Sequence, residues 1–267
     1  MTPARSFNLR RAEISITAQE PKMSFIITLY VQEGIVMASD SRLTVNRHEQ
    51  RGGPGVRISV PLSDANYKTF LAPGNIGIST FGAADINGVP LSGYIEAFIA
   101  ERLVSGTLPL PQIPRLILEH FRAVTPVPDT SFHIAGYTTE NGRRVPQVWS
   151  VSLRENVARQ ANEPGQQGAV WGGETDILSR LLNPVGSLGQ DNVWKPIPAY
   201  PIDWQFFTLQ DAIDFAIFAE RTTIDTLRFQ TREKTVGGPI DVLVIKPDRA
   251  FWVAKKELHA RGSALSI

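Results

Sequence analysis

The sequence predicts an α+β fold, namely a four-layer αββα sandwich of two antiparallel sheets flanked by helices. Three observations support this prediction. Pairs of strands joined by short turns alternate with helical segments along the 267 residues. The first strands are apolar on both faces, which is typical of strands covered on both sides. The strict strand–helix–strand alternation of a doubly wound parallel sheet is absent.

The first half of the chain predicts two hairpins and then two helices. The hairpins cover 25–38 and 67–81, and a short polar or Pro-Gly turn divides each of them. The segment 47–65 between them is rich in glycine and predicts a loop. Apolar residues at helical spacing predict helices over about 88–104 and 112–124.

The second half repeats this pattern. A hairpin is expected over 132–153, followed by a helix over about 174–183 and a Pro-rich loop over 184–206. Thr208-Leu209-Gln210-Asp211 resembles a capping box, so a long helix is predicted to begin there. Two closing strands are expected within 240–254.

Composition excludes several classes of function. Lys and Arg number 27 against 26 Asp and Glu, so the net charge of +1 gives no footprint for nucleic acid or an anionic membrane. The absence of cysteine excludes disulfides and thiolate chemistry. No apolar run approaches the ~18 residues that span a bilayer. No phosphate-binding glycine motif and no ligand-like pairing of histidines is present, so neither cofactor nor metal is expected. We expect a cytoplasmic protein.

Four residues stand at the ends of predicted strands. Ser24 begins the first strand, Asp40 ends the second, Lys68 opens the third and Gly82 ends the fourth. Amide hydrolysis needs a nucleophile, a base and a donor for the oxyanion. A serine at a free N-terminus carries its own base, because an α-amine titrates near ~8 and a lysine near ~10.4.

The other three residues complete this chemistry. Asp40 is expected to pair with Lys68, whose ammonium favours the alkoxide and keeps the α-amine neutral. The N–H of Gly82 would face the oxyanion, and one such donor is typically worth ~3–4 kcal/mol of barrier. Each residue also has a plainer interpretation: Ser24 as a polar strand start, Asp40 in a salt bridge with Arg42, Lys68 as an exposed edge charge and Gly82 as a bend.

The order and spacing of these residues resemble the proteasome β-type subunits, bacterial proteasome homologues among the N-terminal nucleophile hydrolases. The segment 237–242, Gly-Gly-Pro-Ile-Asp-Val, resembles a strand of the same family, so the resemblance covers about 24–255. It implies an endopeptidase that cleaves peptides or unfolded proteins inside stacked rings of its own copies. It also allows for an ATP-dependent unfoldase as a partner, which nothing in this sequence encodes.

The chain departs from the family pattern at the supporting residues. The nucleophile is Ser24 where the family usually has threonine. The two supporting serines align with Gly173 and with Val236, or the second is displaced to Thr235. The supporting acid aligns with Glu233, which joins the candidate catalytic residues. Two alternatives therefore stay open: a catalytically silent ring subunit, and an amidase that acts on a small non-peptide amide.

The mechanism requires a free α-amine on Ser24. Residues 1–22 show no strand or helix period, so we expect 1–23 to be a removable or artefactual extension and 24–267 to be the hydrolase domain. Self-processing relatives carry Gly before the nucleophile, whereas this chain has Met23. We therefore expect translation to begin at Met23, which is then removed, or another protease to trim 1–23.

Two insertions have open interpretations. The segment 47–65 either roofs the cleft or forms a surface loop. The Pro-rich segment 184–206 carries Trp194, Tyr200 and Trp204. These aromatic residues either form a subunit contact or hold the segment against its own domain.

Overall fold

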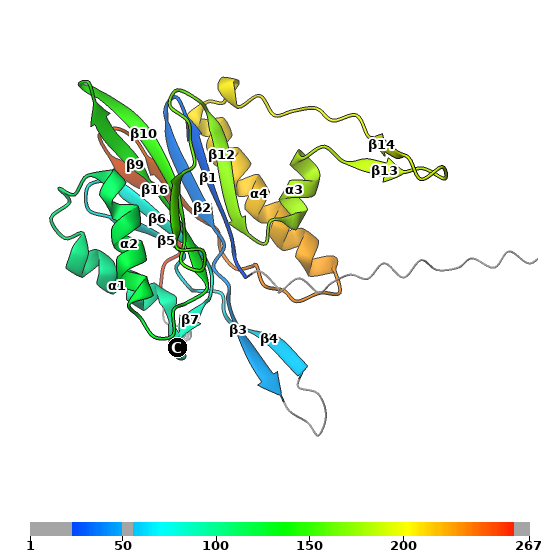
Figure 1. Cartoon of the computed structure of the whole chain (residues 1–267), viewed down its shortest axis with the longest axis horizontal. Coiled ribbons are helices and arrows are strands. Elements are labelled where there is room, and N and C mark those ends of the chain that lie inside the picture. The colour runs from blue at the N-terminus through cyan, green and yellow to red at the C-terminus, as the bar shows by residue number, and fades with distance from the viewer. Residues whose placement is uncertain (1–22, 50–55, 259–267) are drawn as a thin grey trace, which may run out of the picture.

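The computed structural model describes residues 23–49 and 56–258, and two five-stranded antiparallel sheets dominate it (Figure 1). Sheet one has the order β12-β1-β2-β15-β16, with the strands β12 Gly168–Gly173, β1 Phe25–Val31, β2 Gly34–Ser39, β15 Asp241–Ile245 and β16 Ala250–Ala254. Sheet two has the order β11-β10-β9-β6-β5, with the strands β11 Val157–Gln160, β10 Arg143–Ser152, β9 Thr130–Glu140, β6 Ile76–Gly82 and β5 Thr69–Ala72.

The two sheets face each other across an apolar interior. On one side of it Ile35 and Met37 of β2 and Leu243 of β15 are buried, and on the other side Ala135 of β9 and Val148 of β10. Every residue of β1 and β2 is buried, as their apolar sequences predict. Their complete burial fixes the positions of Ser24, which precedes β1, and of Asp40, which follows β2.

Helices pack on the outer faces of both sheets (Figure 1). Helices α1 Leu91–Arg102 and α2 Ile113–Arg122 share an apolar core with sheet two. Helices α3 Asp176–Leu182 and α4 Leu209–Phe229 share a core with sheet one. The predicted capping box at Thr208 is confirmed, because its hydroxyl accepts from the N–H of Asp211 while the Asp211 carboxylate accepts from the N–H of Thr208. Two short 3₁₀ helices are η1 Leu110–Gln112 and η2 Trp204–Phe206.

Three further two-stranded sheets lie outside the larger ones. They are β3 Leu43–Glu49 with β4 Val56–Ser63, β7 Asp85–Ile86 with β8 Val89–Pro90, and β13 Gly186–Leu188 with β14 Trp194–Pro196. The hairpin β3–β4 and the ribbon β13–β14 both project from the body (Figure 1). The segments 47–65 and 184–206, which were predicted to be loops, therefore contain β-strands.

The predicted fold class needs correction. In the ranges described here the chain is α+β with five antiparallel sheets and only four α-helices, so the predicted four-layer αββα sandwich of two sheets alone does not describe it. The expectation treated both insertions as loops, because glycine and proline are common in them. It also missed β11 and β12, the latter an edge strand that pairs with β1 along its length.

The expectation that 1–23 is a removable extension stays a prediction. The extension 1–22 lies outside the described residues, and Met23 is the first residue described. Across 23–49 and 56–258, no helix combines the length and apolar character that crossing a bilayer requires.

Candidate active site

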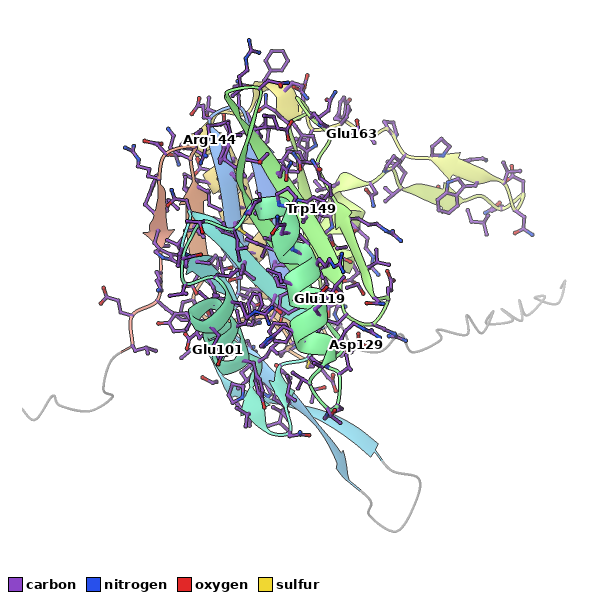
Figure 2. All side chains as sticks on the ribbon, turned by 60° about the vertical axis from the view of Figure 1, so that its left-hand side comes forward. Glu101, Glu119, Asp129, Arg144, Trp149 and Glu163 are labelled. Carbon is purple, nitrogen blue, oxygen red and sulfur yellow. The ribbon has the colours of Figure 1, made fainter. Side chains whose placement is uncertain are left out.

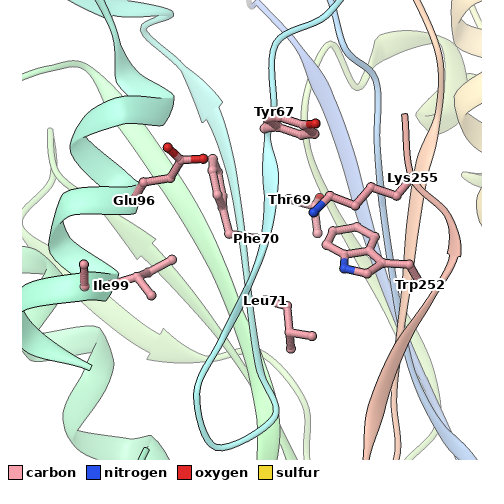
Figure 3. A pocket seen from close by; sticks show the side chains of 9 residues that line it. Tyr67, Thr69, Phe70, Leu71, Glu96, Ile99, Trp252 and Lys255 are labelled. Atoms are coloured by element: carbon pink, nitrogen blue, oxygen red, sulfur yellow. The ribbon is translucent and has the colours of Figure 1, made fainter. Parts of the chain in front are cut away.

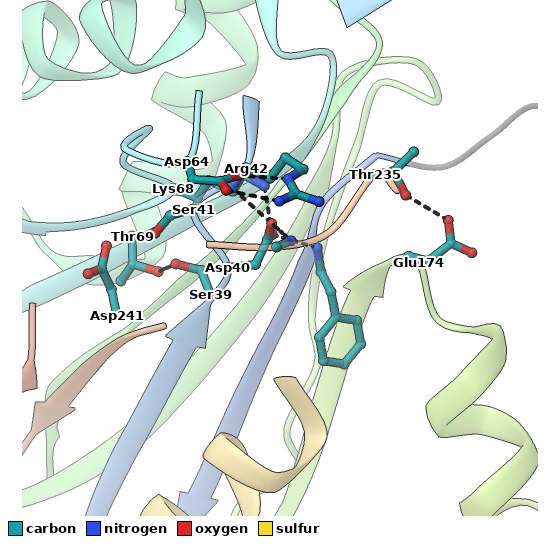
Figure 4. Close-up of polar contacts among 12 residues, drawn as sticks. Ser39, Asp40, Ser41, Arg42, Asp64, Lys68, Thr69, Glu174, Thr235 and Asp241 are labelled. Carbon is teal, nitrogen blue, oxygen red and sulfur yellow. Dashed lines mark hydrogen bonds and ion pairs between the residues drawn. The ribbon is translucent and has the colours of Figure 1, made fainter. Parts of the chain in front are cut away.

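The centre of the candidate site is a buried ion pair between β2 and β5. Nζ of Lys68 lies 2.6 Å from Oδ1 of Asp40, and the two side chains are 3% and 0% exposed. The same carboxylate oxygen accepts a hydrogen bond from the N–H of Phe25 at 3.0 Å (Figure 4). The charged end of Lys68 and the residue after Ser24 therefore share one oxygen atom.

The second oxygen of Asp40 is also fully used. Oδ2 accepts from the N–H of Arg42 at 3.1 Å and from the N–H of Gly237 at 3.0 Å. Four donors thus offset the cost of burying this carboxylate, which a single partner rarely does. The guanidinium of Arg42 pairs instead with Asp64, Nε to Oδ1 at 2.7 Å, so Asp40 and Arg42 form no side-chain salt bridge.

Ser24 lies at the head of β1 in an unusual conformation. Its φ of 72° is in the left-handed region, which costs a residue with a side chain roughly 1–2 kcal/mol. Its carbonyl oxygen accepts from the N–H of Glu174 at 2.8 Å. A Cβ atom at Gly173, whose φ is 90°, would overlap that carbonyl oxygen. The position that aligns with a supporting serine therefore has no room for a side chain.

Gly82 closes the site from β6. Its N–H donates to the carbonyl oxygen of Met23 at 3.4 Å. The φ of Gly82 is 111°, and a Cβ atom there would overlap the carbonyl oxygen of Asp129. The sequence interpretation of this glycine as a plain bend thus omits a second requirement, which is close approach of the neighbouring strand.

A second polar cluster, which the sequence did not suggest as a unit, surrounds Glu174. Its Oε1 accepts from Nη1 of Arg232 at 2.9 Å and its Oε2 from the hydroxyl of Thr235 at 3.3 Å. Nη2 of Arg232 also donates to Asp176 at 3.0 Å. Burial raises the pKa of Glu174, and the charge of Arg232 opposes that rise. Two acidic residues close together in sequence near the start of α3, Glu174 and Asp176, were the sequence signal that could have indicated this cluster.

The remaining predicted residues lie apart from the ion pair. The carboxylate of Glu233 accepts from the N–H of Ser59 at 3.2 Å and also from its hydroxyl, so it holds the hairpin β3–β4. Val236 is buried in the apolar core beneath sheet one. The structure therefore brings together Ser24, Asp40, Lys68 and Gly82, and it directs the Glu233 side chain toward β4.

A cavity of about 420 Å³ lies beside the site (Figure 3). It opens between α1, β5 and β16, where Ile99, Phe70, Trp252 and Lys255 line it. Neither Ser24 nor Gly82 contributes to its wall. Among the described residues, no three side chains of His, Cys, Asp or Glu gather as metal ligands would.

Comparison with known proteins identifies the fold. No family model and no curated protein matches the chain. The solved structure of Anbu (ancestral beta-subunit) from Yersinia bercovieri matches with a TM-score of 0.51 and 14% identity, over 86% of this chain and 87% of that one. Anbu from Hyphomicrobium sp. strain MC1 matches with a TM-score of 0.52 and 16% identity, over 87% and 88%.

These neighbours correct the resemblance stated from the sequence. The matching structures are Anbu proteins, whereas the sequence suggested the bacterial proteasome β-type subunits. The motifs behind that suggestion are short and describe one site, so they are too limited to identify a family. At such low identity the likeness concerns the fold alone, and the chain has an Anbu-like fold.

Proposed function

We propose that this chain is an N-terminal nucleophile hydrolase that cleaves peptide bonds, with Ser24 as its nucleophile once the α-amine of that residue is free. The observation that carries the proposal is the hydrogen bond from Gly82 to the carbonyl of Met23. An acyl carbonyl one bond away from Ser24 already accepts from the donor that an oxyanion would need.

The proposed reaction uses four groups. The Ser24 hydroxyl attacks the substrate carbonyl carbon and gives its proton to the α-amine of the same residue. The oxyanion accepts from the N–H of Gly82, and collapse of the intermediate breaks the C–N bond while the proton passes to the leaving amine. Water then hydrolyses the Ser24 ester. The Lys68 ammonium, which lies 2.6 Å from Asp40, stabilises negative charge on the Ser24 hydroxyl oxygen and disfavours protonation of the Ser24 α-amine.

The support for a peptide substrate is more general. One of the two matching structures is named an ancestral beta-subunit, and we propose that this chain likewise works as a subunit among copies of itself. A closed ring would hold the Ser24 sites away from folded proteins. This supports peptides or unfolded segments as substrates in preference to small amides.

The test uses a chain that begins at Ser24 and an otherwise identical Ser24→Ala chain. Both are incubated with a β-lactone or epoxyketone probe, fluorogenic peptides and small-amide substrates. We expect covalent labelling at Ser24 and turnover of peptides, both lost in Ser24→Ala. Labelling with turnover of small amides alone would support an amidase. If a chain with a verified free Ser24 shows no labelling and no turnover, the result would support a silent subunit.

A third chain, with residues 1–23 attached, is the matched control for the α-amine. Its Ser24 nitrogen is an amide and has no basic lone pair, so we expect it to be unreactive. Equal labelling of the extended and mature chains would contradict the proposed role of the amine.

A further inference from the structure

We propose that the arm, residues 184–203 between α3 and α4, docks onto a second copy of this chain, where Trp194 packs against the exposed ring of Phe218 on α4. This inference rests on the proposed self-assembly and is independent of the hydrolytic chemistry. It assigns a partner to a segment that the catalytic site leaves without a role.

The arm has little to stabilise it within its own molecule. Its strands β13 and β14 have three residues each, and an isolated two-stranded ribbon is marginally stable in water. It stands clear of the body in two views that differ by 60° (Figures 1 and 2). Six large apolar residues of the arm are exposed: Val185, Leu188, Val193, Trp194, Ile197 and Tyr200.

Trp194 is held in place although it is exposed. Its ring lies over Gly186, where a Cβ atom would be 2.5 Å from the indole, so a side chain at this position would displace the ring. At the turn, Nζ of Lys195 lies 3.4 Å from the Asp191 carboxylate. The indole is nevertheless 62% exposed. Tryptophan is among the residues enriched at the centres of binding energy in protein interfaces, and a side chain that is already held in place loses little entropy on binding.

A receptor for this ring lies on the same chain. We call Trp204, Phe207, Phe215 and Phe218 the aromatic row. Ring centroids of Trp204 and Phe215 lie 5.1 Å apart, and those of Phe215 and Phe218 lie 5.8 Å apart. The row joins the base of the arm to α4, and it ends at Phe218, which is 49% exposed. Within the row, Phe215 is edge to face with Trp204 and Phe207 and tilted against Phe218, so a further aromatic ring would extend the row in a geometry that aromatic pairs favour.

The size and charge of the arm favour a second copy as the partner. Trp194 and Tyr200, 62% and 92% exposed, together offer roughly 250–400 Å² of aromatic surface. One side of a standard interface buries ~800 Å² over about 20–30 residues, which the length of the arm approaches. Asp191 and Lys195 neutralise each other, so the tip selects neither an acidic nor a basic partner. In a two-fold pair each arm would reach the row of the other copy.

Sedimentation velocity of the full chain at concentrations from about 1 to 100 μM tests the proposal. We expect assembly of the wild type, and at least about tenfold weaker assembly for Trp194→Ala and for Phe218→Ala. The double variant should be little weaker than either single one, because both remove the same contact. Val104→Ser removes an apolar residue that is 71% exposed but lies elsewhere, and it should assemble as the wild type does.

A photo-crosslinking amino acid at position 194 identifies the contact directly. In a mixture of isotopically light and heavy copies, we expect mixed-mass crosslinks to the peptide that contains Phe218. A monomeric wild type at 100 μM, unchanged assembly of Trp194→Ala, or crosslinks confined to one copy would overturn the proposal. Sedimentation and peptide turnover are also recorded in parallel for the chain that begins at Ser24: assembly without turnover speaks against the proposed function, and turnover without assembly speaks against the arm.

Discussion

The backbone N–H of Gly82 and the carbonyl oxygen of Met23 are joined by a hydrogen bond of 3.4 Å. This bond places the donor of β6 opposite the bond that precedes Ser24. In a chain that begins at Ser24, the carbonyl of a substrate would occupy the position that Met23 holds here. The geometry of this donor is therefore the most direct point at which to test the proposed chemistry.

Gly82→Ala should lower kcat by about 10²–10³ with a smaller change in KM, since the loss concerns a transition-state contact. The reason is that a Cβ atom would overlap the carbonyl of Asp129 and shift the N–H. Gly88→Ala is the matched control, because Gly88 also has a positive φ of 81° but lies in open space. Equal losses of activity in both variants would mean that backbone strain, and not the donor, was responsible.

Lys68→Met should abolish turnover and lower the free energy of unfolding by about 3–5 kcal/mol, because Asp40 would stay buried without its counter-charge. Adding Asp40→Asn to the same chain should restore part of the stability but none of the activity. Urea unfolding and peptide turnover separate the two effects. Arg115→Met removes one partner of an exposed pair, with Arg115 84% accessible, and should change stability little.

Glu220→Gln should stabilise the protein at neutral pH. Glu220 is fully buried on α4, and neither of its carboxylate oxygens has a hydrogen-bond partner among the described residues. Burial, and then the negative charge of Asp40, raise its pKa well above the usual value. As pH rises above the unfolded pKa of about 4.3, the unfolded chain releases a proton that the folded chain keeps, so stability falls.

Thermal unfolding of wild type and Glu220→Gln between pH 4 and pH 8 measures this effect. We expect the melting temperature of the variant to exceed that of the wild type by a few degrees at pH 7, and the difference to shrink toward pH 4. A variant that is less stable than the wild type at pH 7 would show that the carboxyl group has a stabilising partner.

His133 should have the opposite pH dependence. Nδ1 of His133 lies 3.1 Å from the hydroxyl of Thr28, and this contact connects β9 to β1 across the interior. Burial lowers the pKa of His133 to about 4. Between pH 6.5 and 4 the unfolded chain takes up a proton that the folded chain refuses, so stability falls as pH falls, by about 3 kcal/mol in full. His133→Gln should remove this slope in urea unfolding, and an unchanged slope would contradict the assignment.

Local patterns in the sequence were sufficient to predict the strands that carry the four central residues. Apolar runs divided by short turns located β1, β2, β5 and β6, and the ends of these strands meet at one edge. The contacts of Asp40 with Lys68 and Phe25, and of Gly82 with Met23, place Ser24, Asp40, Lys68 and Gly82 near one another, while their catalytic role stays a prediction. The capping box of α4 is likewise a local signal, since both of its residues lie within one turn.

Features that depend on contacts between distant segments were not predictable in this way. Glu174, Arg232 and Thr235 meet only after α3 and the segment before β15 have packed together. The sequence suggests only that Gly173 replaces a supporting serine. In the structure a side chain at this position is excluded by the carbonyl oxygen of Ser24, which is remote in sequence. The strands within the two insertions were not predictable, because the composition of both segments is that of loops.

The four donors of Asp40 come from residues 25, 42, 68 and 237. They span nearly the entire described chain, so no fragment that ends before Gly237 contains the complete carboxylate environment. Contacts of such long sequence separation form late in folding, because a large loop must close before they contribute any stability. During synthesis the proposed reactive centre would thus be absent until the segment around Gly237 has emerged.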